Sequence, residues 1–224
     1  MASRTLSAFV AIVASWGAAS AWAQSAGSIV GRIGATQISP QVTSGDLSSP
    51  SFKGTKVDVK GNTQPTGGLT WMWTDAIAVD VPLAAGFKHD LLGAGAIAGV
   101  GKIGDVHALP ATVMVQYRFL GAGSMVRPYV GLGPTYAYFY DSRSTAALTA
   151  LTGGTPTTPT TISVGSKWTY TAQLGLSVQF GAKWSLDAAA MKTPLKVRTR
   201  LSTGQTLDAT LDPNSVSVGV GYKF

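Results

Sequence analysis

The last eleven residues, NSVSVGVGYKF, alternate strictly between apolar and small or polar side chains. Val216, Val218, Val220, Tyr222 and Phe224 occupy the apolar positions. This two-residue repeat predicts a β-strand with one apolar face. Chain ends usually fray because little ties them down. A pattern that persists to the final residue therefore indicates that the last strand pairs with the first and closes a barrel, since an open edge in lipid would leave backbone groups without partners.

The same alternation recurs in seven earlier stretches, which are GSIVGRIGA, GLTWMW, AIAVDVPL, ATVMVQYRF, RPYVGLGPTYAYFY, TYTAQLGLSVQF and WSLDAAAM. Together with the C-terminal stretch they predict about eight strands, each with one apolar and one polar face. An even number of strands places both chain ends on the same rim of a barrel.

The composition leaves two classes of β protein. Charged residues make up only 12% of the chain, against about 25% in a soluble domain. After the first residues, no stretch is long and apolar enough for a transmembrane helix. The apolar residues therefore either fill the core of a soluble sandwich or lipocalin-like barrel, or face lipid one at a time along transmembrane strands.

The connections favour the membrane. Three are short (TDA, LGAGSMV and GAK), and four are long (roughly 40–56, 88–105, 141–166 and 198–207). Short periplasmic turns and long extracellular loops are typical of outer-membrane barrels. The predicted fold class is therefore all-β, an eight-stranded antiparallel transmembrane β-barrel in the cell outer membrane, with outer-membrane lipids as its surroundings. Segment 141–166 is of low complexity, and we expect it to be mobile.

Residues 1–23 have the pattern of a signal peptide. Arg4 supplies a positive n-region, TLSAFVAIVASWGAAS an apolar h-region, and AWA a small-x-small cleavage site. We predict that the mature barrel comprises residues 24–224. The alternative, a transmembrane anchor, is disfavoured because the apolar run is short and the cleavage site follows it directly.

Several other functions find little support. The net charge of +7 comes from scattered Lys and Arg without a basic run, so nucleic acid is not an expected partner. Cys is absent, which excludes disulfides and thiolate chemistry. The only histidines, His89 and His107, each lie near an Asp and could belong to a hydrolase or metal site. Because GxSxG and HExxH motifs are missing, we interpret them as loop-base residues, with no catalysis, metal or cofactor.

Aromatic residues gather near the predicted short turns, as in the girdle that marks a membrane–water interface. This set comprises Trp71, Trp73, Tyr117, Phe119, Phe180, Trp184, Tyr222 and Phe224. A second set toward the other rim comprises Phe87, Tyr136, Tyr138, Tyr140 and Trp168.

Charged residues on the inward face form the next group. By the alternation, Arg32, Asp80, Arg118 and Asp187 all point into a lumen that side chains can fill. Because an unpaired buried charge is costly, we predict an ion-pair plug in the periplasmic half, with Arg32 between Asp80 and Asp187.

Two prolines stand out in the wall. Pro82 and Pro110 flank the hairpin over 88–105, and they lie almost opposite each other if that hairpin is symmetric about residue 96. Proline lacks an N–H and weakens a sheet. We therefore predict a seam between these strands through which an apolar molecule leaves sideways, or alternatively two bulges that only bend the strands.

Three stretches carry a family resemblance: GLTWMWTDAIAVDVPLAAGFKHDL, KIGDVHALPATVMVQYRF and RPYVGLGPTYAYFYD. Together with Asp212-Pro213 and the closing GVGYKF they resemble the OmpW family, which includes AlkL-type hydrophobic-compound uptake barrels. Gly86 and Ala111 depart from the family pattern, which has Pro at both places.

The resemblance implies passive uptake of small hydrophobic molecules, without catalysis or a cofactor. The ending at Tyr222 and Phe224 also resembles the signal that outer-membrane barrels present to the barrel-assembly machinery. A lipid-modifying enzyme and a structural or adhesive barrel remain the alternative functions.

Overall fold

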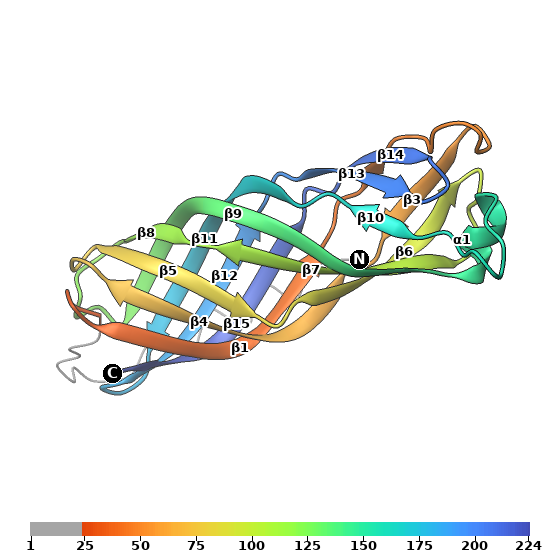
Figure 1. The fold of residues 1–224 in the computed structure, drawn as a ribbon. Coiled ribbons are helices and arrows are strands. Elements are labelled where there is room, and N and C mark those ends of the chain that lie inside the picture. The colour runs from red at the N-terminus through yellow and green to blue at the C-terminus, as the bar shows by residue number, and fades with distance from the viewer. Residues whose placement is uncertain (1–23) are drawn as a thin grey trace, which may run out of the picture.

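A computed structural model describes residues 24–224, which form one elongated barrel (Figure 1). The predicted signal peptide, residues 1–23, lies outside the described residues. Eight strands close the barrel, each antiparallel to its neighbours. In order around the wall they are β1 (Ile29–Ser39), β4 (Asn62–Met72), β5 (Ile77–Ala84), β8 (Met114–Arg118), β9 (Val126–Ser144), β11 (Lys167–Gln179), β12 (Trp184–Lys192) and β15 (Asn214–Lys223).

The last strand closes the barrel against the first, as its alternation predicts. The β1–β15 register runs from Val30 opposite Lys223 to Ser39 opposite Asn214. The Phe224 amide then donates to the Ile29 carbonyl oxygen at 3.0 Å. The C-terminal segment is therefore hydrogen-bonded through its final residue, although the Phe224 side chain is 74% exposed.

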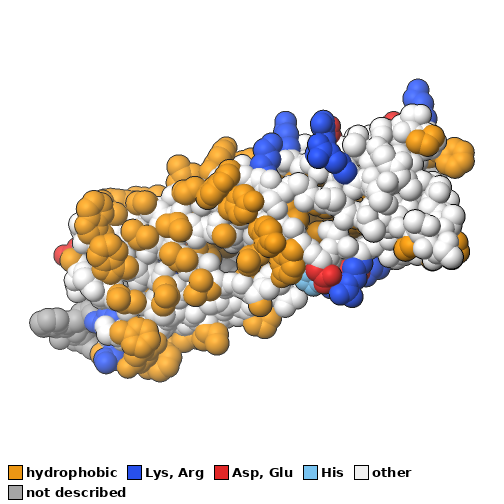
Figure 2. Space-filling view, in the orientation of Figure 1, with side chains coloured by type: hydrophobic (Ala, Val, Ile, Leu, Met, Phe, Trp, Pro, Cys, Tyr) orange, Lys and Arg blue, Asp and Glu red, His pale blue; other side chains and the backbone are white. Residues whose placement is uncertain are grey.

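The outward face of these strands carries a belt of exposed apolar side chains, and Figure 2 shows them gathered over the barrel on the visible face. Adjacent residues of β11 show how the alternation sorts the two faces, because Leu176 is 39% exposed whereas Ser177 is 1% exposed. No helix in the described residues is long and apolar enough to cross a membrane. Phe87 is an exception to the predicted second aromatic set: it is only 1% exposed and faces the lumen.

Beyond the belt the wall continues as an extension made largely of strands (Figure 1). Its elements are β2 (Thr43–Ser44), β3 (Thr55–Val59), β6 (Phe87–Gly95), β7 (Lys102–Thr112), α1 (Ala146–Leu151), β10 (Ile162–Val164), β13 (Lys196–Leu201) and β14 (Thr206–Thr210). Much of 88–105 and 198–207, expected as loops, is thus strand. The reason is visible in β13 and β14, where Val197, Leu201, Leu207 and Ala209 alternate and bury their side chains inward.

Segment 141–166 is also more ordered than its composition predicts. Thr145 caps α1, its hydroxyl accepting from the Leu148 amide. Leu148 is buried in an apolar cluster with Ile103 and Ile162. Leu148 is thus part of the upper core, which explains why segment 141–166 folds against the barrel.

Candidate functional site: the barrel lumen

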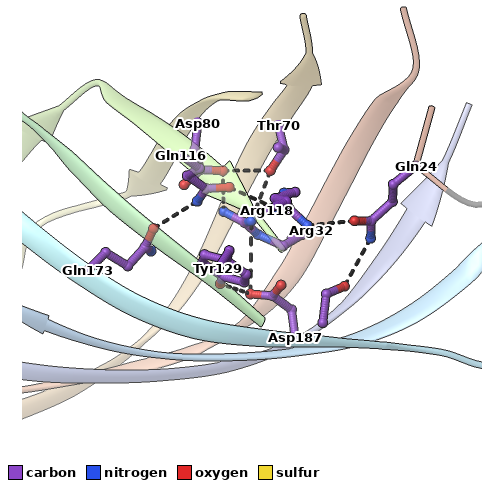
Figure 3. A network of polar contacts seen from close by, with 10 residues as sticks. Gln24, Arg32, Thr70, Asp80, Gln116, Arg118, Tyr129, Gln173 and Asp187 are labelled. Atoms are coloured by element: carbon purple, nitrogen blue, oxygen red, sulfur yellow. Dashed lines mark hydrogen bonds and ion pairs between the residues drawn. The ribbon is translucent and has the colours of Figure 1, made fainter. Parts of the chain in front are cut away.

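The periplasmic half of the lumen is filled by a polar network centred on Arg32 (Figure 3). Arg32 Nη2 lies 2.7 Å from Asp80 Oδ1, and Arg32 Nη1 lies 3.9 Å from Asp187 Oδ1. Arg32 Nη1 also donates to Thr70 Oγ1 at 2.9 Å, and Thr70 donates to Asp80 at 2.6 Å. The structure therefore brings β1, β4, β5 and β12 together through one guanidinium group.

Arg118 joins this network through neutral groups. Its Nη2 donates to Gln116 Oε1 at 2.8 Å and its guanidinium carbon lies 4.7 Å from the centre of the Tyr129 ring. The Tyr129 hydroxyl donates to Asp187 Oδ1 at 2.8 Å. Gln116 in turn donates to Gln173 at 2.7 Å. Arg118 is thus held among amides and an aromatic face, while Tyr129 links it to the carboxylate of Asp187.

Gln24, which precedes β1, lies across the short-turn end of the lumen. Arg118 Nη1 donates to Gln24 Oε1 at 2.6 Å, and Gln24 Nε2 donates to Ser177 Oγ at 2.9 Å. Arg127, fully buried, donates to the carbonyl oxygens of Gln24 at 2.9 Å and Asp75 at 2.6 Å. These contacts tie the chain segment before β1 across the mouth of the barrel.

Glycines on the inward face make room for the large plug side chains. A Cβ added at Gly175 would lie 2.1 Å from Tyr129 Cζ, and one added at Gly68 would lie 2.8 Å from Arg32 Nη2. Each bulky polar side chain therefore lies over the bare backbone of the glycine paired with it on the neighbouring strand, Arg32 over Gly68 and Tyr129 over Gly175. This complementarity lets a narrow barrel hold several long side chains at one level.

Sequence reasoning named four charged members of the network, Arg32, Asp80, Arg118 and Asp187. It missed Gln24, Gln116, Arg127, Tyr129 and Gln173. For Gln116 and Gln173 the signal was available, since both fall on the inward positions of their alternating stretches, and Tyr129 follows from the same rule. Gln24 precedes the first strand, so no alternation applies to it.

The extracellular half of the lumen has the opposite character. A cavity of about 220 Å³, counted as the space open to the centre of a water molecule, lies above the plug. One water needs roughly 10–15 Å³ on this measure, so the cavity has room for a molecule of several heavy atoms. Its upper walls are mostly aliphatic and include Leu91, Ile97, Val106, Leu195 and Leu207.

The wall of this cavity has an interrupted ladder between β5 and β7. The β5–β8 ladder ends at Asp80 opposite Met114, and the β6–β7 ladder begins at Phe87 opposite Ala108. Within the described residues, no ladder pair joins 81–86 to 109–113. We call this interval the seam.

Pro82 and Pro110 both lie along the seam and line the cavity. If the register of Asp80 and Met114 continued, Pro82 would face Thr112 and Pro110 would face Ala84. The two prolines are therefore not opposite each other but offset by two residues. The Asp80–Met114 register places the centre of the hairpin at residue 97 rather than at the predicted 96.

The side chain of Tyr140 crosses the seam on the outer surface. The Tyr140 hydroxyl, from β9, donates to the Ala85 carbonyl oxygen at 3.2 Å. The neighbouring Gly86 has φ of +102°, and a Cβ there would lie 2.3 Å from that hydroxyl. Glycine at 86, where the family pattern has Pro, therefore creates the space that Tyr140 occupies.

The two histidines lie on opposite faces of the β6–β7 sheet and have different partners. In the β6–β7 ladder His89 pairs with Val106 and His107 with Lys88, so the two rings face opposite sides of the sheet. His89 Nδ1 lies 2.8 Å from the Lys60 carbonyl oxygen. His107 stacks on Tyr140 with ring centroids 5.3 Å apart. This placement does not assemble them into one catalytic or metal-binding group.

The aromatic set near the short turns lies on the outer surface. Seven of its eight members are exposed and Tyr222 is half-buried. Tyr222 stacks edge-on with Trp184 at 4.9 Å and with Phe224 at 5.3 Å between centroids. The two residues predicted as an assembly signal are therefore in one aromatic cluster with β12.

A closed antiparallel barrel of eight strands, with an apolar belt outside and a polar plug inside, defines an outer-membrane β-barrel protein. The model of the OmpW family matches residues 25–224, and the chain belongs to this family. Outer membrane protein W of Salmonella typhi is 31% identical over 208 residues, 92% of each chain. Outer membrane protein AlkL of Ectopseudomonas oleovorans is 25% identical over 75% of this chain and 69% of that protein.

Solved structures agree. The crystal structure of the outer membrane protein OprG from Pseudomonas aeruginosa matches with a TM-score of 0.80 at 25% identity, covering 91% of this chain and 99% of that one. The predicted family, the barrel fold and the location in the outer membrane are thereby confirmed.

Proposed function

We propose that this protein mediates passive uptake of small hydrophobic molecules across the outer membrane and releases them sideways through the seam. The observation that carries the proposal is the division of one lumen into an apolar chamber and a polar plug below it. This function agrees with what the family resemblance implies.

The plug supports a lateral route. An apolar molecule that continued toward the periplasm would have to separate Arg32 from Asp80, whose side chain is fully buried. Breaking a buried ion pair leaves a buried charge without a partner, which is costly. A route through the wall above the plug avoids this cost.

The seam supplies such a route. Elsewhere in the belt a molecule leaving sideways would have to break ladder hydrogen bonds between neighbouring strands. At 81–86 and 109–113 no ladder pair has to break, and two prolines contribute no N–H. The cavity reaches this interval, since Pro82, Leu83, Leu109 and Pro110 are among its lining residues.

The test is to close the seam covalently. Leu83→Cys with Ala111→Cys places two thiols across the seam in a chain without other Cys, and a bismaleimide can join them. The matched control joins Leu176→Cys to Ala188→Cys, which face each other in the intact β11–β12 ladder.

Uptake of radiolabelled n-octane by cells carrying each form is then measured against cells without the protein. We expect loss of protein-dependent uptake after cross-linking the seam and retention in the control. Equal uptake by both cross-linked forms would exclude lateral release. Absence of protein-dependent uptake in the unmodified protein would refute the transport function itself.

A further inference from the structure

A collar of threonine hydroxyls separates the plug from the apolar chamber. Thr112 Oγ1 and Thr135 Oγ1 lie 2.9 Å apart, Thr135 and Thr171 2.6 Å, and Thr171 and Thr193 2.8 Å. Facing this chain, Thr36 Oγ1 lies 2.8 Å from Thr66 Oγ1. All six side chains line the cavity, and we call them the threonine collar.

The collar occupies one level of the lumen. On β1, Thr36 stands between Arg32 of the plug and Ile38 of the upper wall. On β9, Thr135 stands between Tyr129 of the plug and Ala137 of the apolar cluster. The lumen therefore passes from charged to hydroxylated to aliphatic along the same strands.

The four-membered hydroxyl chain is left with unused hydrogen-bonding capacity. Each threonine hydroxyl supplies one proton and two acceptor lone pairs. Three contacts between four hydroxyls engage three protons, so one donor and several lone pairs remain for a partner. Thr135 and Thr171 are nearly fully buried in the protein, where a hydrogen bond is stronger than in water.

Resting on the transport function proposed above, we infer that the threonine collar binds the polar head of an amphiphilic cargo whose apolar tail lies in the upper chamber. The preferred cargo class is then a medium-chain molecule with one neutral hydrogen-bonding head, such as a primary alcohol.

The collar does not suit a charged head. It contains no formal charge, and hydroxyls alone do not offset the cost of moving a carboxylate or ammonium out of water. Arg32, the plug cation that lines the same cavity, is already engaged by Asp80 at 2.7 Å. A pure hydrocarbon fits the chamber but gains no hydrogen bond from the collar.

The position of the collar also suits lateral release. Thr112 lies at the plug-side end of the seam, two residues from Pro110, where the β7 ladder with β5 is absent. A head held there keeps the cargo at the level of the open wall, and release does not require any movement into the plug.

The experiment compares 1-octanol with n-octane, which differ by one hydroxyl. Cells carrying the protein take up each radiolabelled compound, and the rate of cells without the protein is subtracted. The test variant is Thr135→Val combined with Thr171→Val, which keeps the side-chain shape and removes two hydroxyls. The control is Thr63→Val, an exposed threonine of β4 outside the collar.

We expect the test variant to lower the ratio of octanol to octane uptake about five-fold, the effect of one net hydrogen bond. Octanoate should show no collar-dependent uptake. An unchanged ratio, or an equal loss for both compounds, would show that the collar is only structural.

Failure of the transport function looks different, since neither compound would then enter faster than in cells without the protein. If the double variant does not reach the folded, heat-modifiable form, Thr193→Val removes only the last hydroxyl of the chain and is judged by the same ratio.

Discussion

The two halves of the lumen are built on the same strands yet differ in chemistry. On β1, Ile38 of the upper wall lies six positions after Arg32 of the plug. On β9, Ala137 of the upper wall lies eight positions after Tyr129 of the plug. The membrane constrains the outward face, where apolar side chains are required along the belt. The inward face is under no such constraint, so its chemistry can change along a strand from an ionic network to an apolar chamber.

The difference also teaches how each half is stabilised. The lower half relies on hydrogen-bonded and paired polar groups in a packed lumen, although Asp80 Oδ2 and Arg118 Nε are buried without a hydrogen-bond partner among the described residues. Removing a partner from such groups is costly. The upper half relies on aliphatic packing around a cavity, where small changes in side-chain volume are better tolerated.

The largest expected effect comes from removing the central cation. Arg32→Leu leaves Asp80 and Asp187 buried without their shared partner, and we expect it to lower the free energy of unfolding by about 3–5 kcal/mol. The matched change in the upper wall is Ile38→Val, with an expected cost of about 0.5–1.5 kcal/mol. Urea unfolding in detergent micelles measures both, and equal losses would remove the energetic distinction between the halves.

A smaller effect should follow from filling one of the bare backbone positions. Gly175→Ala places a methyl group 2.1 Å from Tyr129 Cζ, which must move and release Asp187. Overpacking of this kind costs about 1–3 kcal/mol, and the conductance of planar bilayers to salt should rise.

Gly121→Ala is the control, because a Cβ there meets nothing within 4 Å. If both alanine variants keep the parent's stability and conductance, the plug does not depend on the tight contact between Tyr129 and Gly175.

Much of the lower half could be predicted from the sequence, and less of the upper half. The alternation identifies the inward positions of a strand, so Arg32, Asp80 and Asp187 could be placed at one level from the pattern of residues alone. The partners of Arg118 could not, because the choice among inward amides depends on stagger between strands that are distant in the chain.

The upper half was harder for a different reason. Its walls come from segments whose Gly, Ser and Thr content is typical of loops, and their pairing depends on contacts such as Ile162 opposite Leu201. The approximate position of the seam could be predicted because proline lacks an N–H and removes a ladder hydrogen bond. The Tyr140 contact was not, since it depends on the space above Gly86.

The outer side of the seam offers a smaller and more local test. Tyr140→Phe removes the hydrogen bond to the Ala85 carbonyl oxygen, which is worth about 0.5–1.5 kcal/mol at most for a partly exposed group. We expect little change in global stability but faster amide hydrogen exchange at residues 85–87.

Tyr138→Phe on the same face is the control, because no hydrogen bond of the Tyr138 hydroxyl is found in residues 24–224. Equal exchange rates in the two variants would show that Tyr140 does not hold the seam.

The smallest effect concerns an ion-pair cluster around a solvent-exposed lysine, Lys102, which contrasts with the buried pair in the plug. Lys102 Nζ lies 2.6 Å from Asp90 Oδ1 and 2.9 Å from Asp105 Oδ2 on the β6–β7 hairpin. The hydrogen bond from Lys102 lowers the pKa of Asp105. Because the folded-state pKa is lowered, the contribution to stability is present above the ordinary carboxyl pKa near 3.9 and is lost as the pH falls through the lower folded value.

Lys102→Gln should therefore leave the unfolding midpoint almost unchanged at neutral pH, since exposed pairs contribute little and salt screens them. Its small deficit should vanish in high salt, and it should shrink as the pH falls from the ordinary carboxyl pKa through the lower folded-state pKa of Asp105. Unfolding midpoints at pH 7 and pH 3, each at low and high salt, measure this. A loss as large as that of Arg32→Leu, persisting in high salt, would mean that the outer hairpin is stabilised by charge in the same way as the plug.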